Sequence, residues 1–500
     1  MPLSCRQIVD SSKINILEGV KMSLLTFDEL NKRLKKYNQQ HLLQFWNELT
    51  VEQKSILISQ IERIDFSLVN ELAKSHVLNK PVIKIPENLT PPDYYHVLPL
   101  NDKQKKLYSD AEKLGKKLIS ESKVAAFTVA GGQGTRLGYD GPKGTYPITP
   151  VKGKSLFQYF AESIKMYSIK YNNCTIPWYI MTSEMNHNET IVFFERNNYF
   201  GLCKKNVMFF IQGVMPALDY NGKILMESKY TISLSPDGHG GSLKALMSSG
   251  ALEDMKRRNI EHISYFQVDN PLVTIMNPLF IGLHCIENSE MSSIMLAKTG
   301  PYEKLGNFCV SNGRLMIIEY SDMPSHLAEK KNEDGSLTFI AGSPAIHILS
   351  RQFIERLTSD GKVALPWHRA DKKVSHINTE GSYIEPSDAN AVKLETFIFD
   401  ALPLAKKTII FEADRQKEFA PTKNRTGVDS VESCRKMMIE RDCNRLEKFA
   451  GTSIPRDSSN LPECELEISP LSFVDDEDIV ANRLKLHPLK IVKGGKIYIE

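Results

Sequence analysis

The segment that decides the fold is AAFTVAGGQGTRLGYDGPKG, residues 125–144. A short apolar run, VAAFTV at 124–129, leads into its glycines, which is typical of a β-strand that ends in a tight loop. Glycines let the backbone approach a ligand closely, and successive exposed N–H groups can bind phosphate oxygens. Arg136 and Lys143 add positive charge. The segment therefore predicts a phosphate-binding loop at the end of a strand.

Two common phosphate-binding motifs do not fit this loop. From Gly132 the spacing is G-x-G-x-x-x-G, whereas a dinucleotide fingerprint requires G-x-G-x-x-G and an acidic residue about 20 positions later. Residues 145–160 contain no acidic residue, and no Walker A pattern is present in the segment. The remaining alternative is a glycine turn without a ligand, which the neighbouring Arg136 and Lys143 disfavour.

Three more apolar runs follow the loop: TIPWYIMT (175–182), NVMFFI (206–211) and HISYFQV (262–268). Helical patterns lie between them, for example over 241–258. Strands that alternate with helices indicate an α/β protein with a mostly parallel sheet covered on both faces. Ligands bind beyond the carboxyl ends of the strands in such sheets, so we expect the site at that edge.

The flanking regions have different patterns. Residues 1–120 are predicted to form a helical region, 121–425 the catalytic domain and 426–500 a small β-rich domain, with strand-like pieces and no clear helix after 460. Within the central region, Asn-Gly at 312–313 predicts a hairpin over 307–320. Residues 390–405 are predicted to form a helix and 407–414 a strand.

Composition narrows the class of protein. A length of 500 residues predicts two or three domains. The 63 basic and 60 acidic residues argue against a nucleic-acid binder. Eight scattered cysteines without a C-x-x-C pair indicate reduced thiols, and no apolar run approaches the length of a membrane span. With no apolar signal core at the N-terminus, we expect a cytoplasmic protein with no membrane partner.

The glycine loop and seven later segments resemble the eukaryotic-type UDP-sugar pyrophosphorylases, a family that includes bacterial members. The segments, in the order of that family, are IQGVMPAL, SPDGHGGSLKAL, FQVDNPLV, IIEYSDMP, VKLETFIFD, EFAPTKN and CELEISPL. The similarity is greatest to the UDP-N-acetylglucosamine branch. It implies a Rossmann-like (GT-A-like) nucleotidyltransferase core with a mixed sheet, an N-terminal helical region and a β-helix-like C-terminal domain. It also implies that the chain joins UTP to a sugar 1-phosphate and releases pyrophosphate.

The resemblance implies three sets of site residues. The residues expected around the nucleotide are Val129, Ala130, Gly131, Gly132, Lys143, Gln212, Gly238, Asp269 and Lys393. Those expected around the sugar phosphate are His239, Glu319, Tyr320, Ser343, Phe397, Phe399 and Lys423. Arg136, Lys143 and Lys423 would act in catalysis, and Asp269 would hold Mg²⁺, the expected cofactor. UTP and the sugar 1-phosphate are the expected partners of a monomer or homo-oligomer.

Several of these residues have a simpler interpretation. Asp269, followed by Asn270 and Pro271, has the pattern of a helix N-cap. The two phenylalanines fit an ordinary core, and the lysines fit a solvated surface. No histidine spacing typical of zinc occurs, and His347 and His368 are expected to be structural.

The sequence departs from the family pattern where the sugar is expected. His239 stands where the acetylglucosamine branch usually has Asn, and Ile340 to Ser343 replaces N-A-G-N. Because Asn both donates and accepts hydrogen bonds, these changes leave the sugar open among the 1-phosphates of N-acetylglucosamine, N-acetylgalactosamine, glucose and galactose. Two alternatives to the acetylglucosamine enzyme remain: a UTP–glucose-1-phosphate uridylyltransferase and a catalytically silent nucleotide-sugar binding protein.

Overall fold

The computed structural model describes residues 26–81, 85–359, 361, 363, 365–487 and 489–500. Residues 1–25, which include Cys5 and for which no signal sequence is expected, lie outside the described residues. The chain divides into two compact units. The smaller unit combines the residues up to Asn79 with Pro216–Ser233 and Asp371–Val392, and the larger unit contains Lys80–Met215, Leu234–Ala370 and Lys393–Glu500.

The smaller unit begins with three helices, as the sequence predicts: α1 (Phe27–Lys36), α2 (Val51–Arg63) and α3 (Phe66–Leu72). The first two start with capping boxes, in which Thr26 pairs with Glu29 and Thr50 with Gln53. Short strands from later in the chain complete this unit: β5 (Leu218–Asp219), β6 (Met226–Ser228), β7 (Thr231–Ile232), β16 (His376–Ile377) and β17 (Tyr383–Ile384).

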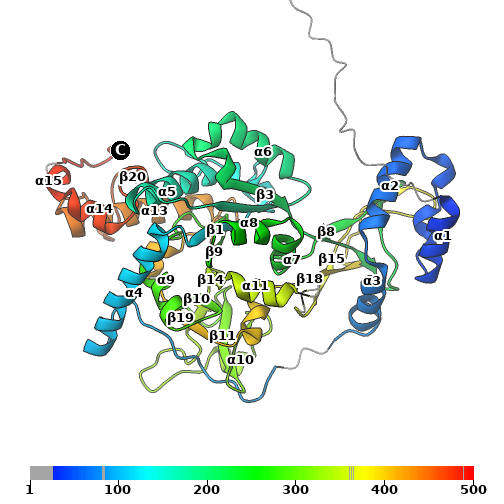
Figure 1. Ribbon diagram of the computed structural model, residues 1–500, viewed down its shortest axis with the longest axis horizontal. Helices are drawn as coiled ribbons and strands as arrows, with labels where there is room; N and C mark the ends of the chain where they lie inside the picture. The colour runs from blue at the N-terminus through cyan, green and yellow to red at the C-terminus, as the bar shows by residue number, and fades with distance from the viewer. Residues whose placement is uncertain (1–25, 82–84, 360, 362, 364, 488) are drawn as a thin grey trace, which may run out of the picture. The chain divides into compact units, whose positions relative to one another are not determined.

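A mixed sheet forms the centre of the larger unit (Figure 1). Its order is β12-β11-β13-β10-β14-β9-β1-β2-β3, and β19 also pairs with β10. The strands are β1 (Val124–Val129), β2 (Trp178–Thr182), β3 (Val207–Ile211), β9 (His262–Gln267), β10 (Met291–Ala297), β11 (Gly306–Ser311), β12 (Arg314–Ile318), β13 (Ala341–Ser343), β14 (His347–Ser350) and β19 (Thr408–Glu412). The neighbours β9, β1, β2 and β3 are parallel, whereas β14 joins β9 in antiparallel fashion. The α/β class and the mixed sheet are therefore confirmed.

Helices cover both faces of this sheet. Along β1, Val124 and Ala126 face a core with α4, α5, α9 and α13, whereas Phe127 and Val129 face a core with α7, α8 and α11. This alternation follows from the two-residue period of a strand. The helices of this unit include α4 (Asp102–Ser120), α5 (Leu156–Lys170), α6 (His187–Arg196), α7 (Gly241–Ser248), α8 (Ala251–Arg257), α9 (Pro278–Ile286), α10 (Ser325–Ala328), α11 (Arg351–Thr358), α12 (Arg415–Glu418) and α13 (Val431–Arg445).

Local predictions in the larger unit have mixed outcomes. The hairpin at 307–320 is confirmed as β11 and β12, with Asn312 and Gly313 at positive φ, and the strand at 407–414 is β19. The helix predicted over 390–405 is wrong. The structure has β18 (Ala391–Glu395) followed by a 3₁₀ turn, Ile398–Leu404. The start of β18 pairs with β5, and Pro403 disfavours a continued α-helix because it lacks an N–H group.

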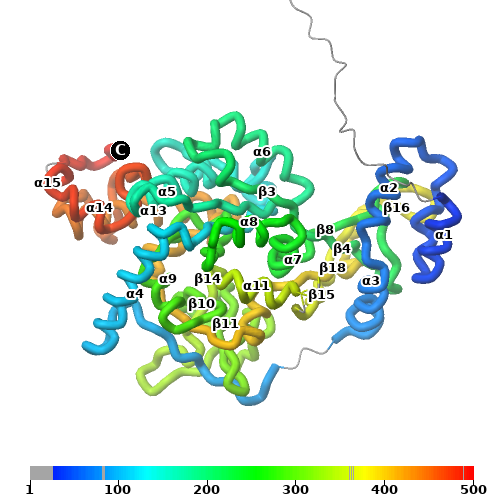
Figure 2. Tube along the Cα trace, in the orientation of Figure 1, coloured from blue at the N-terminus to red at the C-terminus, as the bar shows by residue number. Residues whose placement is uncertain are grey.

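The C-terminal region is less β-rich than the sequence predicts. The two expected strands are β20 (Glu465–Ile468) and β21 (Lys496–Ile499), which pair in parallel. The expectation of no helix after 460 is wrong, since α14 (Asp476–Ala481) and α15 (Arg483–Leu486) lie between them (Figure 2). A capping box formed by Asp475 and Asp478 starts α14. Among the described residues, no helix is both long and apolar enough to cross a membrane.

Candidate active site

The first part of the site lies where four parallel strands end. Gly131, Gln212 and Asp269 come one or two residues after β1, β3 and β9, respectively. The ends of these strands are aligned, because Val129 pairs with both Met181 and Gln267 in the sheet. Segments that are far apart in the sequence therefore meet at one edge of the sheet, as expected for a ligand site in an α/β fold.

The glycine loop is held in place by hydrogen bonds to its own backbone and to Asn186. The Lys143 N–H donates to the Gly132 carbonyl at 3.0 Å. The buried Asn186 amide donates to the carbonyls of Ala130 and Gly132 at 3.0 and 3.3 Å. Sequence reasoning missed Asn186, because a single Asn before a helix carries no signal for a contact with a loop over 50 residues earlier.

Gly131 lies against the side chain of Gln212. A Cβ at position 131 would lie 2.1 Å from the Gln212 side-chain oxygen, which no packed structure tolerates without displacement. Gly238 is required by the backbone: its φ is +83°, and a Cβ there would meet the Thr396 carbonyl at 2.3 Å.

Asp237 is a second residue that sequence reasoning missed. Its side chain is 7% exposed, and one carboxylate oxygen makes no hydrogen bond within the described part of the chain. Burial raises its pKa to about 6. Two other buried oxygens, Gln133 Oε1 after β1 and Ser183 Oγ after β2, also have no hydrogen-bond partner among the described residues. Unpaired buried polar groups are rare in folded proteins, so these three oxygens are candidates for contact with a polar ligand.

Lys143 and Asp269 join the glycine loop to a cavity. Lys143 Nζ lies 3.9 Å from Asp269 Oδ2, and both side chains are less than a fifth exposed. Arg136 is different: it is exposed and forms no ion pair among the residues that the structure describes. Of the predicted cations, Lys143 is therefore the one placed against the carboxylate.

A cavity of about 240 Å³ begins at Asp269. Six of the predicted residues line it, on segments spread over 185 positions: His239, Asp269, Glu319, Ser343, Phe399 and Lys423. Tyr320, Lys393 and Phe397 are not in its wall, and Tyr320 is 42% exposed.

The segment of Lys423 is fastened to that of Asp269 by hydrogen bonds. The Thr422 N–H donates to the Asp269 carbonyl at 2.8 Å. The buried Asn270 side chain accepts from the Ala420 N–H at 2.9 Å and donates to the Glu418 carbonyl at 2.7 Å. The helix-cap interpretation of Asp269 is wrong, because the next helix begins at Pro278 with Asn277 as its N-cap.

The rings of His239 and Phe399 line one wall of the cavity, and Phe397 packs against His239. The ring of His239 lies 5.2 Å from that of Phe397 and 5.7 Å from that of Phe399. His239 Nδ1 accepts a hydrogen bond from the Ile398 N–H at 3.1 Å. Burial and the nearby His368 lower the pKa of His239 to about 4, so the ring is neutral at pH 7 and its proton sits on Nε2. His239 therefore offers a hydrogen-bond donor from this wall.

His368, expected to be structural, stands behind this wall. Its ring lies 4.5 Å from that of Phe397, and its Nε2 is 2.8 Å from Asp400. Burial alone would lower the pKa of His368, but the hydrogen bond and the charge of Asp400 outweigh it and raise the pKa. For Glu319, burial raises the pKa, and the charge of Asp322 adds to this effect.

His347 agrees with its structural prediction. It is fully buried in β14, and its Nδ1 is 2.8 Å from the Ser293 hydroxyl. Burial lowers its pKa to about 3, so it is a neutral core residue.

The chain is similar to known proteins over most of its length. A family model described as UTP–glucose-1-phosphate uridylyltransferase matches residues 67–468. The UDP-N-acetylglucosamine pyrophosphorylase of Saccharomyces cerevisiae is 36% identical over 413 residues, which are 78% of this chain and 84% of the relative. UDP-N-acetylglucosamine diphosphorylase 2 of Arabidopsis thaliana is 34% identical over 472 residues, or 90% and 91% of the two chains.

A solved structure shares the fold. The crystal structure of the uridine diphosphate N-acetylglucosamine pyrophosphorylase from Trypanosoma brucei, in complex with an inhibitor, superimposes with a TM-score of 0.80. It is 26% identical, and the match covers 96% of this chain and 99% of that one.

Proposed function

Because the chain belongs to the UDP-sugar pyrophosphorylase family, we propose that it transfers a uridylyl group from UTP to N-acetylglucosamine 1-phosphate and releases pyrophosphate. The observation that carries this proposal is the contact of Lys143 with Asp269, which joins the glycine loop to the cavity that Lys423 also lines. UTP would lie along the strand ends, and the sugar phosphate would lie in the cavity.

The reaction needs positioning and positive charge more than a base. An oxygen of the sugar phosphate attacks the α-phosphorus of UTP, and the bond from that phosphorus to the pyrophosphate oxygen breaks. The attacking oxygen is already ionised at neutral pH, so no proton has to be removed. The main barrier is the repulsion between two anions, which fixed cations reduce.

We assign this task to two lysines. Lys143, beside the glycine loop, would bind the phosphates of UTP and stabilise the leaving pyrophosphate. Lys423 lines the cavity and would bind the sugar phosphate next to the α-phosphate. Arg136 is exposed near the loop and would add charge at the outer phosphates.

Asp269 would hold Mg²⁺. Mg²⁺ commonly takes one or two carboxylates from the protein and its other ligands from phosphate and water. A single half-buried carboxylate at the end of β9 fits that pattern, since no group of three or more His, Cys, Asp or Glu residues in the described chain could form a complete metal cage. When bound, the metal would neutralise charge on the triphosphate.

The aromatic wall supports an acetylated sugar. His239 Nε2–H would donate to the acetamide carbonyl, with the ring of Phe399 against the methyl group. Glu319 would accept a hydrogen bond from a sugar hydroxyl. Ser343, which also lines the cavity, can both donate and accept hydrogen bonds.

A release assay tests the proposal. The full chain is incubated with Mg²⁺, UTP and each of four 1-phosphates, those of N-acetylglucosamine, N-acetylgalactosamine, glucose and galactose, and pyrophosphate is measured. We expect the highest kcat/KM with N-acetylglucosamine 1-phosphate. A preference for glucose 1-phosphate would change the proposed sugar substrate but leave the proposed reaction unchanged. Binding of UTP without release from any sugar would contradict the enzymatic proposal.

We also propose a cytoplasmic location. All seven described cysteines are free thiols, including Cys443 and Cys464, whose sulfur atoms lie 3.9 Å apart. Free thiols so close together favour a reducing compartment. Fractionation of cells that express the chain would test this proposal, and recovery in a secreted or organellar fraction would contradict it.

A further inference from the structure

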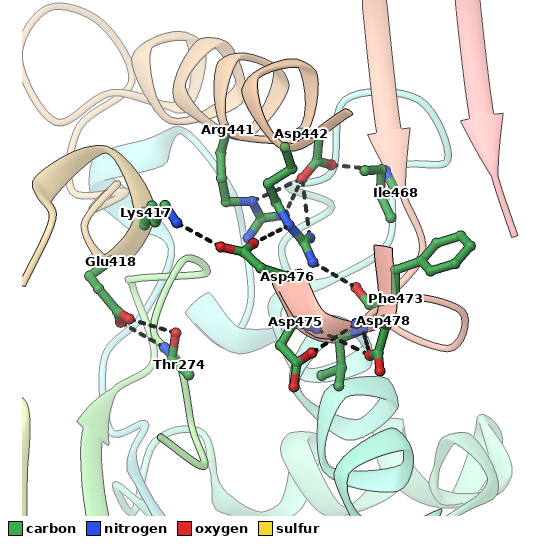
Figure 3. Close-up of polar contacts among 12 residues, drawn as sticks. Thr274, Lys417, Glu418, Arg441, Asp442, Ile468, Phe473, Asp475, Asp476 and Asp478 are labelled. Carbon is green, nitrogen blue, oxygen red and sulfur yellow. Dashed lines mark hydrogen bonds and ion pairs between the residues drawn. The ribbon is translucent and has the colours of Figure 1, made fainter. Parts of the chain in front are cut away.

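A second cavity, larger than the first, lies in the same unit. Its volume is about 360 Å³, within the range of small-molecule sites. Residues that follow Asp269, namely 271–274, form one wall together with Lys417 and Glu418. The facing wall comes from the C-terminal region, residues 473–477 (Figure 3). Helices α4, α5 and α13 complete it.

This cavity shares its inner wall with the candidate active site. The Glu418 carboxylate accepts from the Thr274 N–H at 2.9 Å and from the Thr274 hydroxyl at 2.6 Å. Figure 3 shows this pair and, at some distance from it, Asp475, and all three residues line the cavity. The Glu418 carbonyl is held by Asn270, next to the proposed metal ligand. The same two segments therefore face the first cavity with Asp269 and Lys423, and the second with Thr274 and Glu418.

Three tyrosines of α5 and its C-terminal end line the second cavity: Tyr159, Tyr167 and Tyr171. Tyr171 is 7% exposed, yet its hydroxyl makes no hydrogen bond with any described residue. The rings of Tyr167 and Tyr171 are parallel, with an angle of 6° between them. Tyr159 accepts from Arg441, so its own proton remains to be donated. Burial raises the pKa of all three phenols, which keeps them protonated as donors.

Apart from Glu418, most charged groups of the cavity already form ion pairs. Lys417 and Arg445 both contact Asp476, at 2.6 and 3.0 Å. Lys116 pairs with Glu477 at 2.6 Å. Arg441 donates to Asp442, which is deeply buried. A charged ligand would have to break these pairs, whereas a neutral ligand would leave them intact.

We propose that this cavity binds a neutral, polyhydroxylated small molecule such as an unphosphorylated monosaccharide. Its hydroxyl oxygens would accept from the phenols, above all from the unpartnered Tyr171, and its hydroxyl protons would bind carboxylate oxygens such as those of Glu418. The face of a tyrosine ring provides the apolar surface against which the C–H groups of a sugar pack. The inference does not depend on the proposed reaction.

The protonation of Glu418 supports the choice of a neutral ligand. Burial raises the pKa of Glu418 to about 7, although the two Thr274 donors act in the opposite direction. A carboxyl group that is partly protonated at neutral pH gains little from a cationic ligand, but it can accept from, or donate to, a hydroxyl group.

Ligand-observed saturation-transfer NMR on the full chain tests the site. D-glucose is titrated in the presence of saturating UDP-N-acetylglucosamine, which would fill the first cavity. Tyr171→Phe removes only the unpartnered hydroxyl, so the fold should be unaffected. Tyr383→Phe, at an exposed residue outside this cavity, is the matched control. Methyl phosphate and methylamine, whose methyl protons the method detects, serve as charged probes.

We expect glucose to bind the wild-type chain and the Tyr383→Phe variant equally. Its Kd should rise about three- to tenfold in Tyr171→Phe, the size of one lost hydrogen bond. Equal Kd values in Tyr171→Phe and wild type, absence of glucose binding, or tighter binding of either charged probe would overturn the proposal. Because no turnover is measured, the result is independent of whether the proposed reaction occurs.

Discussion

The nucleotide side and the sugar side of the candidate active site are built from different materials. On the nucleotide side, aligned strand ends place main-chain groups, and glycine is required by close main-chain contacts such as that of Gly238 with the Thr396 carbonyl. On the sugar side, side chains from separate segments make the wall, among them His239 and Ser343, where the sequence is expected to depart from the family pattern. Main-chain geometry tolerates little change, whereas a side-chain wall can be altered residue by residue. We therefore expect the first half to determine the reaction and the second half to select the sugar.

The largest effect should follow from loss of a cation where the two halves meet. Lys143→Ala removes the amine that lies 3.9 Å from Asp269, and we expect kcat to fall about 10²- to 10³-fold, because one positioned donor contributes on that scale. Steady-state kinetics with both substrates would measure it. Lys106→Ala, at an exposed residue of α4, is the control and should retain full activity. Near wild-type kcat in Lys143→Ala would contradict the assigned role.

A smaller effect should distinguish the nucleotide side from the sugar side. In Gly131→Ala the new methyl group would lie 2.1 Å from Gln212, so that side chain must move out of place. We expect kcat/KM for UTP to fall about 10- to 100-fold, as one misplaced binding group can cause. The KM for the sugar phosphate should stay nearly constant. Gly300→Ala, where a Cβ meets nothing within 4 Å, is the matched control. Equal changes in the KM values for UTP and for the sugar phosphate would contradict the proposed division into a nucleotide side and a sugar side.

The nucleotide side of the site could be predicted from the sequence better than the sugar side, for physical reasons. A strand followed by glycines is a local pattern, so the position of the loop could be predicted from 125–144 alone. The sugar wall depends on contacts between residues far apart in the chain. His368 and Asp400 are 32 positions apart, and neither has a local signal for their 2.8 Å contact.

The wrong helix at 390–405 has a similar cause. Its apolar residues fit a helical period, but Ala391 and Val392 pair with β5, and the Thr396 N–H donates to the Asp237 carbonyl at 2.8 Å. Tertiary pairing outweighs local propensity here. This strand and the 3₁₀ turn place Phe397 and Phe399 around His239, which a helix would not have done.

A change in sugar preference should follow from His239→Phe. The phenyl ring keeps the apolar contact with Phe397, but it removes the Nε2–H donor. We expect kcat/KM for N-acetylglucosamine 1-phosphate to fall about tenfold, and that for glucose 1-phosphate to fall less, because only the former has an acetamide to bind. His239→Asn restores a donor and should recover part of the loss. An equal fall in kcat/KM with both sugar 1-phosphates would show that His239 does not bind the acetamide.

The smallest expected effect concerns the His368–Asp400 pair behind the sugar wall. The folded-state pKa of His368 is raised, so its stabilising contribution is complete below the unfolded pKa of about 6.5 and is lost as pH rises through the folded value. The His368 side chain is 34% exposed, and solvent screening limits the contribution to about 1 kcal/mol or less.

Asp400→Asn tests that sign, because the amide keeps a hydrogen-bond acceptor and removes the charge. Urea unfolding of the wild type and the variant at pH 5.5 and pH 9 would compare their free energies of unfolding. We expect the variant to be less stable at pH 5.5 and nearly equal at pH 9, where His368 is neutral in both. A larger difference at pH 9 would mean that Asp400 acts through some group other than His368. Since the pair packs on Phe397, its loss at high pH should also raise the KM for the sugar phosphate while the KM for UTP stays constant.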